Sequence, residues 1–252
     1  GPASEAQFRH PASVLVRSDG SVLVADSGNH RIRIIRDGSV SVYAGIPVSI
    51  VFDEAGLPAG TLEDGPADES LFSNPTGLAA DRHGNVYVAD AANHAVRKIS
   101  PSGDVTTLAG NGVLGHKDGT GSEASFHRPT DVAVDAGGNV YVADTLNHVI
   151  RKITPQGEVT TLNALPARIA EVSDGVVVPA GGFADGPLDQ ALFNEPSGLA
   201  LDSQGNLYVS DTGNQRIRYI NFAEGTVTTV AGGGDLAEYA LYVEGGYTDG
   251  PA

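Results

Sequence analysis

One sequence pattern occurs four times along this chain, and its parts follow in the same order in each copy. Each copy starts at a proline and continues through an apolar run, a glycine-containing turn and a second apolar run that ends at an aspartate. An Asn-His or Asn-Gln pair and two further runs complete it. A pattern repeated at this length indicates that one small structural unit is stacked on copies of itself. The four starting residues are Pro11, Pro75, Pro129 and Pro196.

Each copy contains four short runs that alternate apolar and polar residues, which is the pattern of β-strands. In the second copy these runs are residues 77–80, 86–89, 95–99 and 105–108. A glycine between the first two runs can supply the positive φ of a tight turn, at Gly20, Gly84, Gly138 and Gly205. The sequence therefore predicts an all-β chain, a β-propeller with four blades of four antiparallel strands.

We expect one domain over residues 1–252, because four blades and their connections account for the whole chain. The surplus over an ordinary blade length lies in segments that are too short to be further blades. The repeats cover about 1–45, 64–110, 118–162 and 185–232, and the long connecting loops are 46–63, 163–184 and 233–248.

A second motif, D-G-x-x-x-x-[AS]-x-F, precedes three of the prolines and starts at Asp64, Asp118 and Asp185. The chain begins with this motif lacking its aspartate and ends with the motif's first residues. We therefore predict a ring that closes at the chain termini, with a fragment of a larger array or an eight-bladed dimer as alternatives. Each aspartate is expected to cap a turn, with a repeated calcium loop as the alternative. The phenylalanines expected to be buried are Phe8, Phe72, Phe126 and Phe193.

The string GNVYVADxxNHxIRKIxPxGxVTTLAG, with variations in each copy, resembles the NHL repeat. The naming pair is present at residues 29–30, 93–94 and 147–148, whereas Asn214-Gln215 departs from it. The D-G-x-x-x-x-[AS]-x-F motif resembles the long-repeat variant of bacterial surface proteins and teneurin-like proteins. The resemblance implies a propeller in a family that includes RNA binders, protein-interaction modules, sensor ectodomains and a few lyases.

The chain carries a formal charge of -16, from 15 Lys and Arg against 31 Asp and Glu. Such a field repels phosphate backbones and anionic lipid surfaces, so we expect no nucleic-acid partner. No apolar stretch approaches the length of roughly 20 residues that spans a bilayer, so we expect no membrane insertion. The chain has no cysteine and hence no thiolate site. A closed ring is expected to be a monomer, and the family resemblance with the absence of cysteine implies an extracellular or bacterial cell-surface location.

An aspartate ends the second run of every copy, and an arginine follows seven residues later in the third run. Their presence in every copy indicates a role in the scaffold, because a catalytic pair would normally be singular. The histidines of the Asn-His pairs lie too far from the expected axis to share one metal ion, so we expect them to satisfy backbone groups of the turn. The four pairs of aspartate and arginine are Asp26 with Arg33, Asp90 with Arg97, Asp144 with Arg151, and Asp211 with Arg218.

Asp131 stands where the other copies have serine or glycine, at the start of the innermost strand. A carboxylate there faces the axial mouth and could hold a cation such as calcium near first-strand carbonyl oxygens, or it could be a solvated rim residue. No other cofactor is expected.

The long connections are expected to meet on one face, where acidic and aromatic residues suit a protein, peptide or glycan ligand. Extra hairpins, including one at residues 176–178, are the alternative. Because no catalytic motif is found, we predict a non-catalytic scaffold or ligand-binding module of a secreted or cell-surface bacterial protein. The alternative is an NHL-type lyase or hydrolase with an axial metal. The candidate binding residues are Phe52, Asp53, Glu54, Asp174, Phe183, Tyr239 and Tyr242.

Overall fold

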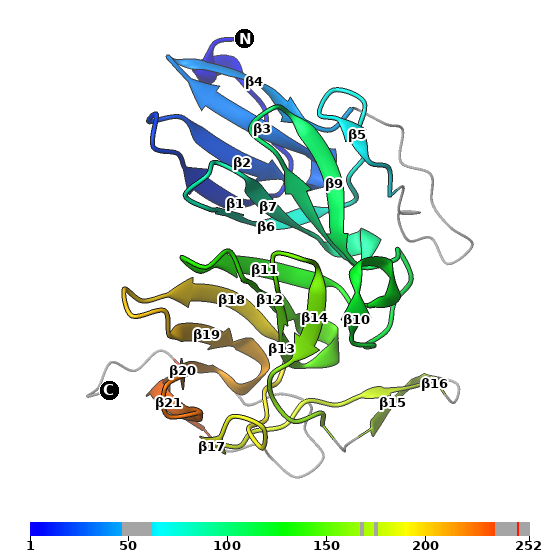
Figure 1. Cartoon of the computed structure of the whole chain (residues 1–252), viewed down its shortest axis with the longest axis vertical. Coiled ribbons are helices and arrows are strands. Elements are labelled where there is room, and N and C mark those ends of the chain that lie inside the picture. Colours follow the sequence, from blue (N-terminus) through cyan, green and yellow to red (C-terminus); the bar gives the residue numbers. More distant parts are fainter. Residues whose placement is uncertain (47–61, 167–168, 174–175, 235–245, 247–252) are drawn as a thin grey trace.

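The computed structural model describes residues 1–46, 62–166, 169–173, 176–234 and 246, and in this part the fold is all-β (Figure 1). Four antiparallel sheets follow one another along the chain, which confirms four blades. Blade 1 consists of β1 (Pro11–Val16), β2 (Val22–Asp26), β3 (Arg31–Arg36) and β4 (Ser39–Ala44). Blade 2 consists of β5 (Gly65–Pro66), β6 (Pro75–Ala80), β7 (Val86–Asp90), β8 (Ala95–Ile99) and β9 (Asp104–Ala109).

The other two sheets repeat this arrangement. Blade 3 consists of β10 (Gly119–Thr120), β11 (Pro129–Val134), β12 (Val140–Asp144), β13 (Val149–Ile153) and β14 (Glu158–Thr161). Blade 4 consists of β17 (Gly186–Pro187), β18 (Pro196–Leu201), β19 (Leu207–Asp211), β20 (Arg216–Asn221) and β21 (Thr226–Gly232).

Blades 2 to 4 each have a fifth strand of two residues, which the sequence analysis did not predict. The second and third residues of the D-G motif form it and pair with the outermost long strand, as Gly65 does with Val105. In blade 1, Pro2 makes the equivalent bridge to Ser39. The motif that precedes each blade is therefore hydrogen-bonded to that blade's outer edge.

A short 3₁₀ turn follows the second strand of every blade and ends in a residue at positive φ. His30, His94, His148 and Gln215 occupy this position, with φ between 50° and 58°. The glycines expected in the turns between the first two strands also have positive φ, from 79° to 87°. Both reversals in the chain thus have the backbone conformation that a tight turn requires.

The hydrophobic core is divided among the three joints between consecutive blades. Along each strand, alternate side chains point into the joint on one side or the other, as Val88 does toward blade 1 and Tyr87 toward blade 3. The inner strands pack in the order β1, β6, β11, β18. The apolar side chains on one face of a blade are therefore buried only where a neighbouring blade packs against that face.

The four blades form an open arc, with blade 1 at one end and blade 4 at the other (Figure 1). No contact comparable to those between the other inner strands joins β18 to β1. On β1, Val14 and Val16 are 68% and 70% exposed. The predicted closure of a four-bladed ring is therefore wrong for the described residues. Repeat spacing gives the number of blades, but the angle between blades depends on the side chains packed in each joint. The two alternatives, a fragment of a larger array and an eight-bladed dimer, are compatible with open ends.

A hairpin of β15 (Ile169–Ser173) and β16 (Val176–Pro179) lies in the connection between blades 3 and 4. The alternative interpretation of residues 176–178 as an extra strand is confirmed. This connection is thus partly ordered by its own pairing, apart from the four blades.

Gly77 marks a close approach between β6 and β11. An added Cβ would lie 2.5 Å from the Cα of Asp131, which is far inside van der Waals contact. We predict that Gly77→Ala lowers the free energy of unfolding by about 1–3 kcal/mol, because the inner strands must separate. Gly233→Ala, where an added Cβ meets no atom within 4 Å, is the control. Urea denaturation of both variants measures this, and equal stabilities would contradict the close approach.

Candidate functional site

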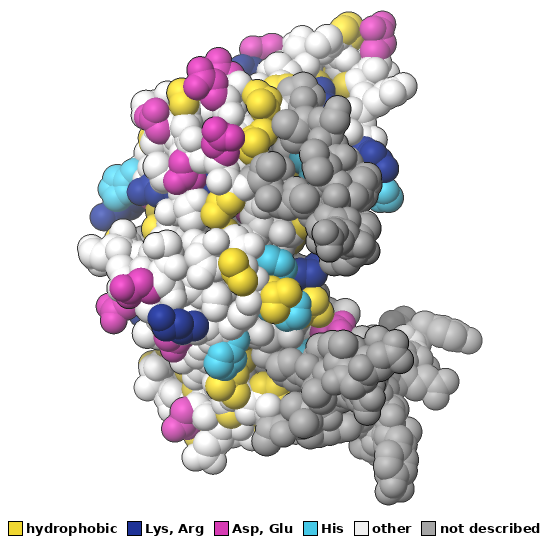
Figure 2. Space-filling view, turned by 90° about the vertical axis from the view of Figure 1, so that its right-hand side faces the viewer, with side chains coloured by type: hydrophobic (Ala, Val, Ile, Leu, Met, Phe, Trp, Pro, Cys, Tyr) yellow, Lys and Arg dark blue, Asp and Glu magenta, His cyan; other side chains and the backbone are white. Residues whose placement is uncertain are grey.

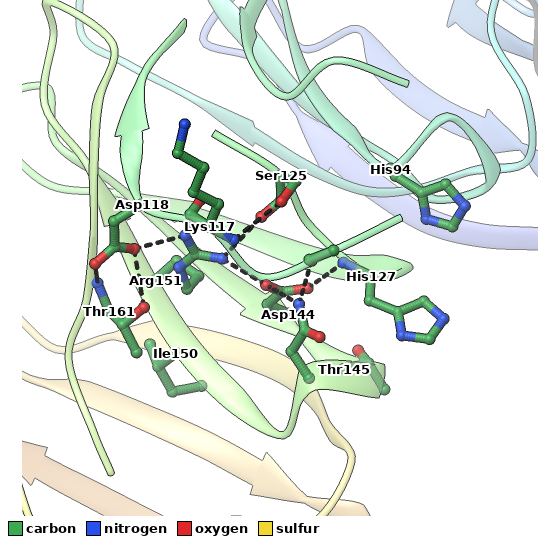
Figure 3. A network of polar contacts seen from close by, with 12 residues as sticks. His94, Lys117, Asp118, Ser125, His127, Asp144, Thr145, Ile150, Arg151 and Thr161 are labelled. Carbon is green, nitrogen blue, oxygen red and sulfur yellow. Dashed lines mark hydrogen bonds and ion pairs between the residues drawn. The ribbon is translucent and has the colours of Figure 1, made fainter. Parts of the chain in front are cut away.

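A buried ion pair connects the strands of each blade, and blade 3 shows it in full (Figure 3). Arg151 and Asp144 have no exposed side-chain surface, and a guanidinium Nη1 lies 2.8 Å from a carboxylate oxygen. The carboxylate of Asp144 also accepts hydrogen bonds from the side chain of Asn147 and the backbone N–H of His127. Complete burial raises the pKa of Asp144, while Arg151 and these donors oppose that rise.

The second guanidinium nitrogen of Arg151 binds Asp118, the first residue of the D-G motif, at 2.6 Å. Asp118 in turn accepts hydrogen bonds from the backbone N–H and hydroxyl of Thr161 in β14. The expectation that this aspartate caps a turn was wrong, because it joins the buried arginine to the outer strand. The arginine also lies 5.0 Å above the ring of Phe126, which is fully buried as predicted.

The same contacts recur in blades 2 and 4, through Arg97 with Asp64 and Arg218 with Asp185. Blade 1 has only the inner pair, in which Arg33 lies 3.1 Å from Asp26 and is 15% exposed. Three of the four predicted phenylalanines are buried, whereas Phe8 is only partly buried. These carboxylates and guanidinium groups are thus occupied in holding the blades together, as the repetition predicted.

The histidines of the Asn-His pairs connect neighbouring blades. Nδ1 of His30, His94 and His148 accepts a hydrogen bond from a backbone N–H that precedes the next blade's inner strand. The three donors, Asn74, Arg128 and Glu195, all have φ between 49° and 53°. Burial lowers the pKa of His94 to about 4, with smaller effects of His127 and Arg128, so the ring is neutral at physiological pH and can accept this bond. Each of these side chains does satisfy a backbone group, but the expectation that this group belongs to the turn was wrong, because the donor lies before the next blade's inner strand.

Asp131 lies between the inner strands β11 and β18. One carboxylate oxygen accepts from the N–H of Leu199 in blade 4 at 2.8 Å, and the other accepts from the N–H of Val132. Burial raises the pKa of Asp131 to about 6 against these two donors. Among the described residues, no three acidic or histidine side chains gather where they could hold a metal ion. The structure thus gives Asp131 a role in the joint between blades 3 and 4, and an axial cation there stays a prediction.

Residues 111–117, 163–166 and 180–184 belong to the connections between blades, and we call the surface that they form the loop face. Figure 2 views the molecule from the side on which β10 and the hairpin of β15 and β16 lie in Figure 1. Of the predicted binding residues, Phe183 lies here, 45% exposed, with its ring 4.1 Å from the guanidinium carbon of Arg216. The other six lie outside the described residues: Phe52, Asp53, Glu54, Asp174, Tyr239 and Tyr242.

Three more exposed apolar side chains lie on the same connections, and sequence reasoning did not single them out. Val113, Leu114 and Leu165 are 64%, 60% and 47% exposed. Figure 2 shows histidine and hydrophobic side chains together on this side of the molecule. The rings of His94 and His127 are 5.8 Å apart, edge to face. The signal in the sequence was the presence of apolar residues in connections that break the repeat.

Four sheets packed face to face around successive inner strands define a propeller-type protein built from repeated blades. The NHL repeat pattern matches this chain at residues 8–35, 72–99, 126–153 and 193–218, once in each blade. The chain belongs to the NHL-repeat family, as the Asn-His pairs indicated.

Two curated relatives show how far the similarity extends. The chain is 31% identical over 243 residues to NHL repeat-containing protein 2 of Gallus gallus, covering 88% of this chain and 31% of that protein. It is 29% identical over 233 residues to Teneurin-4 of Homo sapiens, covering 87% of this chain and 8% of that protein. The chain thus spans less than a third of the length of these relatives.

A solved putative gluconolactonase has a similar fold, with a TM-score of 0.55 and 14% sequence identity. The match covers 91% of this chain and 65% of that chain. At this identity the similarity shows the fold alone.

The ion pairs predict that replacing the arginine by methionine lowers the free energy of unfolding by different amounts in blades 1 and 3. Arg151→Met leaves Asp144 fully buried without its cation, and we expect a loss of about 3–5 kcal/mol in the free energy of unfolding. Arg33→Met in blade 1 is the matched control and is expected to cost less than half of that, because water can reach the partly exposed site. Chemical denaturation measures both. Equal losses of unfolding free energy in the two variants would contradict the view that complete burial and the outer aspartate Asp118 make the pair in blade 3 more important for stability.

The raised pKa of Asp131 predicts a pH dependence. Because its pKa in the folded chain, about 6, exceeds the ordinary value of 3.8, its contribution to stability is complete below about pH 4 and is lost as pH rises to about 6. We therefore expect the stability difference between wild type and Asp131→Asn to change by on the order of 3 kcal/mol over this interval. Urea denaturation at a series of pH values measures it, and a constant difference would contradict the shift.

Proposed function

We propose that this chain is a non-catalytic binding module that holds a protein or peptide ligand against its loop face. The observation that carries the proposal is the exposure of four large apolar side chains on connections between blades: Val113, Leu114, Leu165 and Phe183. Rigid blades that present irregular connections are a common arrangement for binding sites. Apolar side chains on such a surface favour a partner that can cover them.

The charged groups of the blades support binding over catalysis. The repeated arginines and aspartates bind each other or backbone groups, and Asp131 accepts two backbone N–H groups. A general acid or base needs a proton site that reaches a substrate. In the described part of the chain these carboxylates are occupied within the scaffold. The lyase or hydrolase alternative would need a ligand set or a base that these residues do not form.

The net charge of -16 favours a partner with basic residues beside its apolar ones. A glycan remains the other ligand class that the sequence suggested. None of the described helices is long and apolar enough to cross a membrane. A secreted or cell-surface bacterial location is part of our proposal and rests on the family resemblance.

We predict that replacing Leu114 by serine weakens binding at least tenfold, because burying a leucine side chain contributes about 1.5–3 kcal/mol. Arrays of basic, neutral and acidic peptides, together with glycans, identify a ligand for wild type, and titration calorimetry compares the variants. Val16→Ser changes a valine on β1 that is 70% exposed, against 60% for Leu114; it is the control and should leave binding unchanged.

Two results would contradict the proposal. One is a ligand whose affinity does not respond to Leu114→Ser or Phe183→Ala. The other is turnover of a lactone substrate by the purified chain with added calcium or zinc, which would support the hydrolase alternative.

A further inference from the structure

The three joints between blades are built from the same contacts. A side chain at the positive-φ position of one blade accepts a backbone N–H that precedes the inner strand of the next, as His30 does from Asn74. A backbone N–H at the end of the outer strand donates to the next blade's D-G motif, as Gly45 does to Ala67. Apolar side chains fill the space between, and Ile32, Val96 and Ile150 at one repeat position are all fully buried.

Among the residues that the structure describes, the outer face of blade 4, which we call the tail face, has the first half of such a joint without the second. Ile217 occupies the position of those three buried residues and is 39% exposed, and Tyr208 and Val230 beside it are 39% and 38% exposed. Gln215 stands in place of the histidine, is exposed, and keeps its positive φ of 54°. Its amide oxygen can accept a backbone N–H as imidazole Nδ1 does.

A hollow of about 230 Å³ lies on the tail face. It is lined by residues that include Gln215, Arg216 and Gly232. In the first joint, the equivalent Gly45 faces the ring of Phe72, which an added Cβ would approach to 3.1 Å. The hollow thus corresponds to the place that Phe72 of the D-G motif occupies in the first joint.

The outer face of blade 1, which we call the head face, has the second half of the joint. Phe8 is only partly buried, whereas its three equivalents are at most 1% exposed. Val14 is 68% exposed, whereas its equivalents Leu78 and Val132 are 7% and 3% exposed. His10 has φ of 49°, the conformation of the residues that donate to the histidines in the other joints.

We propose that the tail face of one copy of this chain binds the head face of a second copy and forms a fourth joint. The backbone N–H of His10 donates to the amide oxygen of Gln215, and Phe8 fills the hollow beside Gly232. The apolar residues Val14 and Ile217 then pack between blades as their equivalents do in the three joints within the chain. Because head and tail lie at opposite ends of the arc, this joint forms between copies (Figure 1).

Two single variants test the joint. Val14→Asp disables the head face and Ile217→Asp disables the tail face, so each variant alone lacks one half of every joint. Sedimentation velocity over a range of concentrations should show assembly of wild type to at least twice 25.8 kDa and a monomer for each variant. An equimolar mixture of the two variants should form a heterodimer through the one intact pair of faces.

Controls separate this joint from other effects. Val113→Asp changes an equally exposed valine of the loop face and should assemble as wild type does. Circular dichroism establishes that each variant is folded. A wild-type chain that stays monomeric at all concentrations would overturn the proposal. A mixture of the two folded variants that does not associate would also overturn it, because the mixture contains one intact head face and one intact tail face. Self-association of either variant alone would overturn it too, because that variant would be pairing through two copies of the same face.

Discussion

The buried guanidinium of blades 2 to 4 is the interaction on which the rest of the structure depends. In blade 3, Arg151 binds the carboxylate at the end of β12, the backbone oxygen of Ser125 before the inner strand, and the D-G motif at the outer edge. One side chain therefore fixes the second and third strands and the incoming and outermost segments relative to one another. The cost of burying the charge is offset because the second guanidinium nitrogen donates hydrogen bonds to the carboxylate of Asp118 and to the backbone carbonyl of Lys117.

The joints between blades depend on a different constraint, the positive φ at the end of the 3₁₀ turn. This conformation aims His94 at the N–H of Arg128, whose own positive φ turns that N–H toward the histidine. Such a joint needs no covalent link, and each blade has one half of it on each face. An arc assembled in this way leaves one unmatched half at each end, whatever its number of blades.

The sequence analysis predicted the blades and the scaffold role of the Asp and Arg pairs, because a repeat reports contacts that every copy makes. It also predicted the burial of four phenylalanines, which is right for three of them and wrong for Phe8 at the open end. It could not place Asp118, whose partner Thr161 lies 43 residues further along the chain. It expected Asp131 to face the axial mouth, yet the carboxylate accepts the N–H of Leu199, 68 residues away. Contacts at this separation, and the angle between blades, depend on packing that local patterns do not encode.

Departures from the repeat separate the surfaces that serve a partner from those that serve the scaffold. Val113 and Leu114 belong to a connection that no other blade shares, so no contact between blades requires them to be apolar. Val14 and Ile217 occupy repeat positions whose equivalents are packed into a joint, so the repeat alone explains their apolar character. Exposure of the first pair therefore supports the proposed ligand surface, whereas exposure of the second pair supports the proposed joint between copies. The same solvent exposure thus has two different physical meanings, and the position within the repeat decides between them.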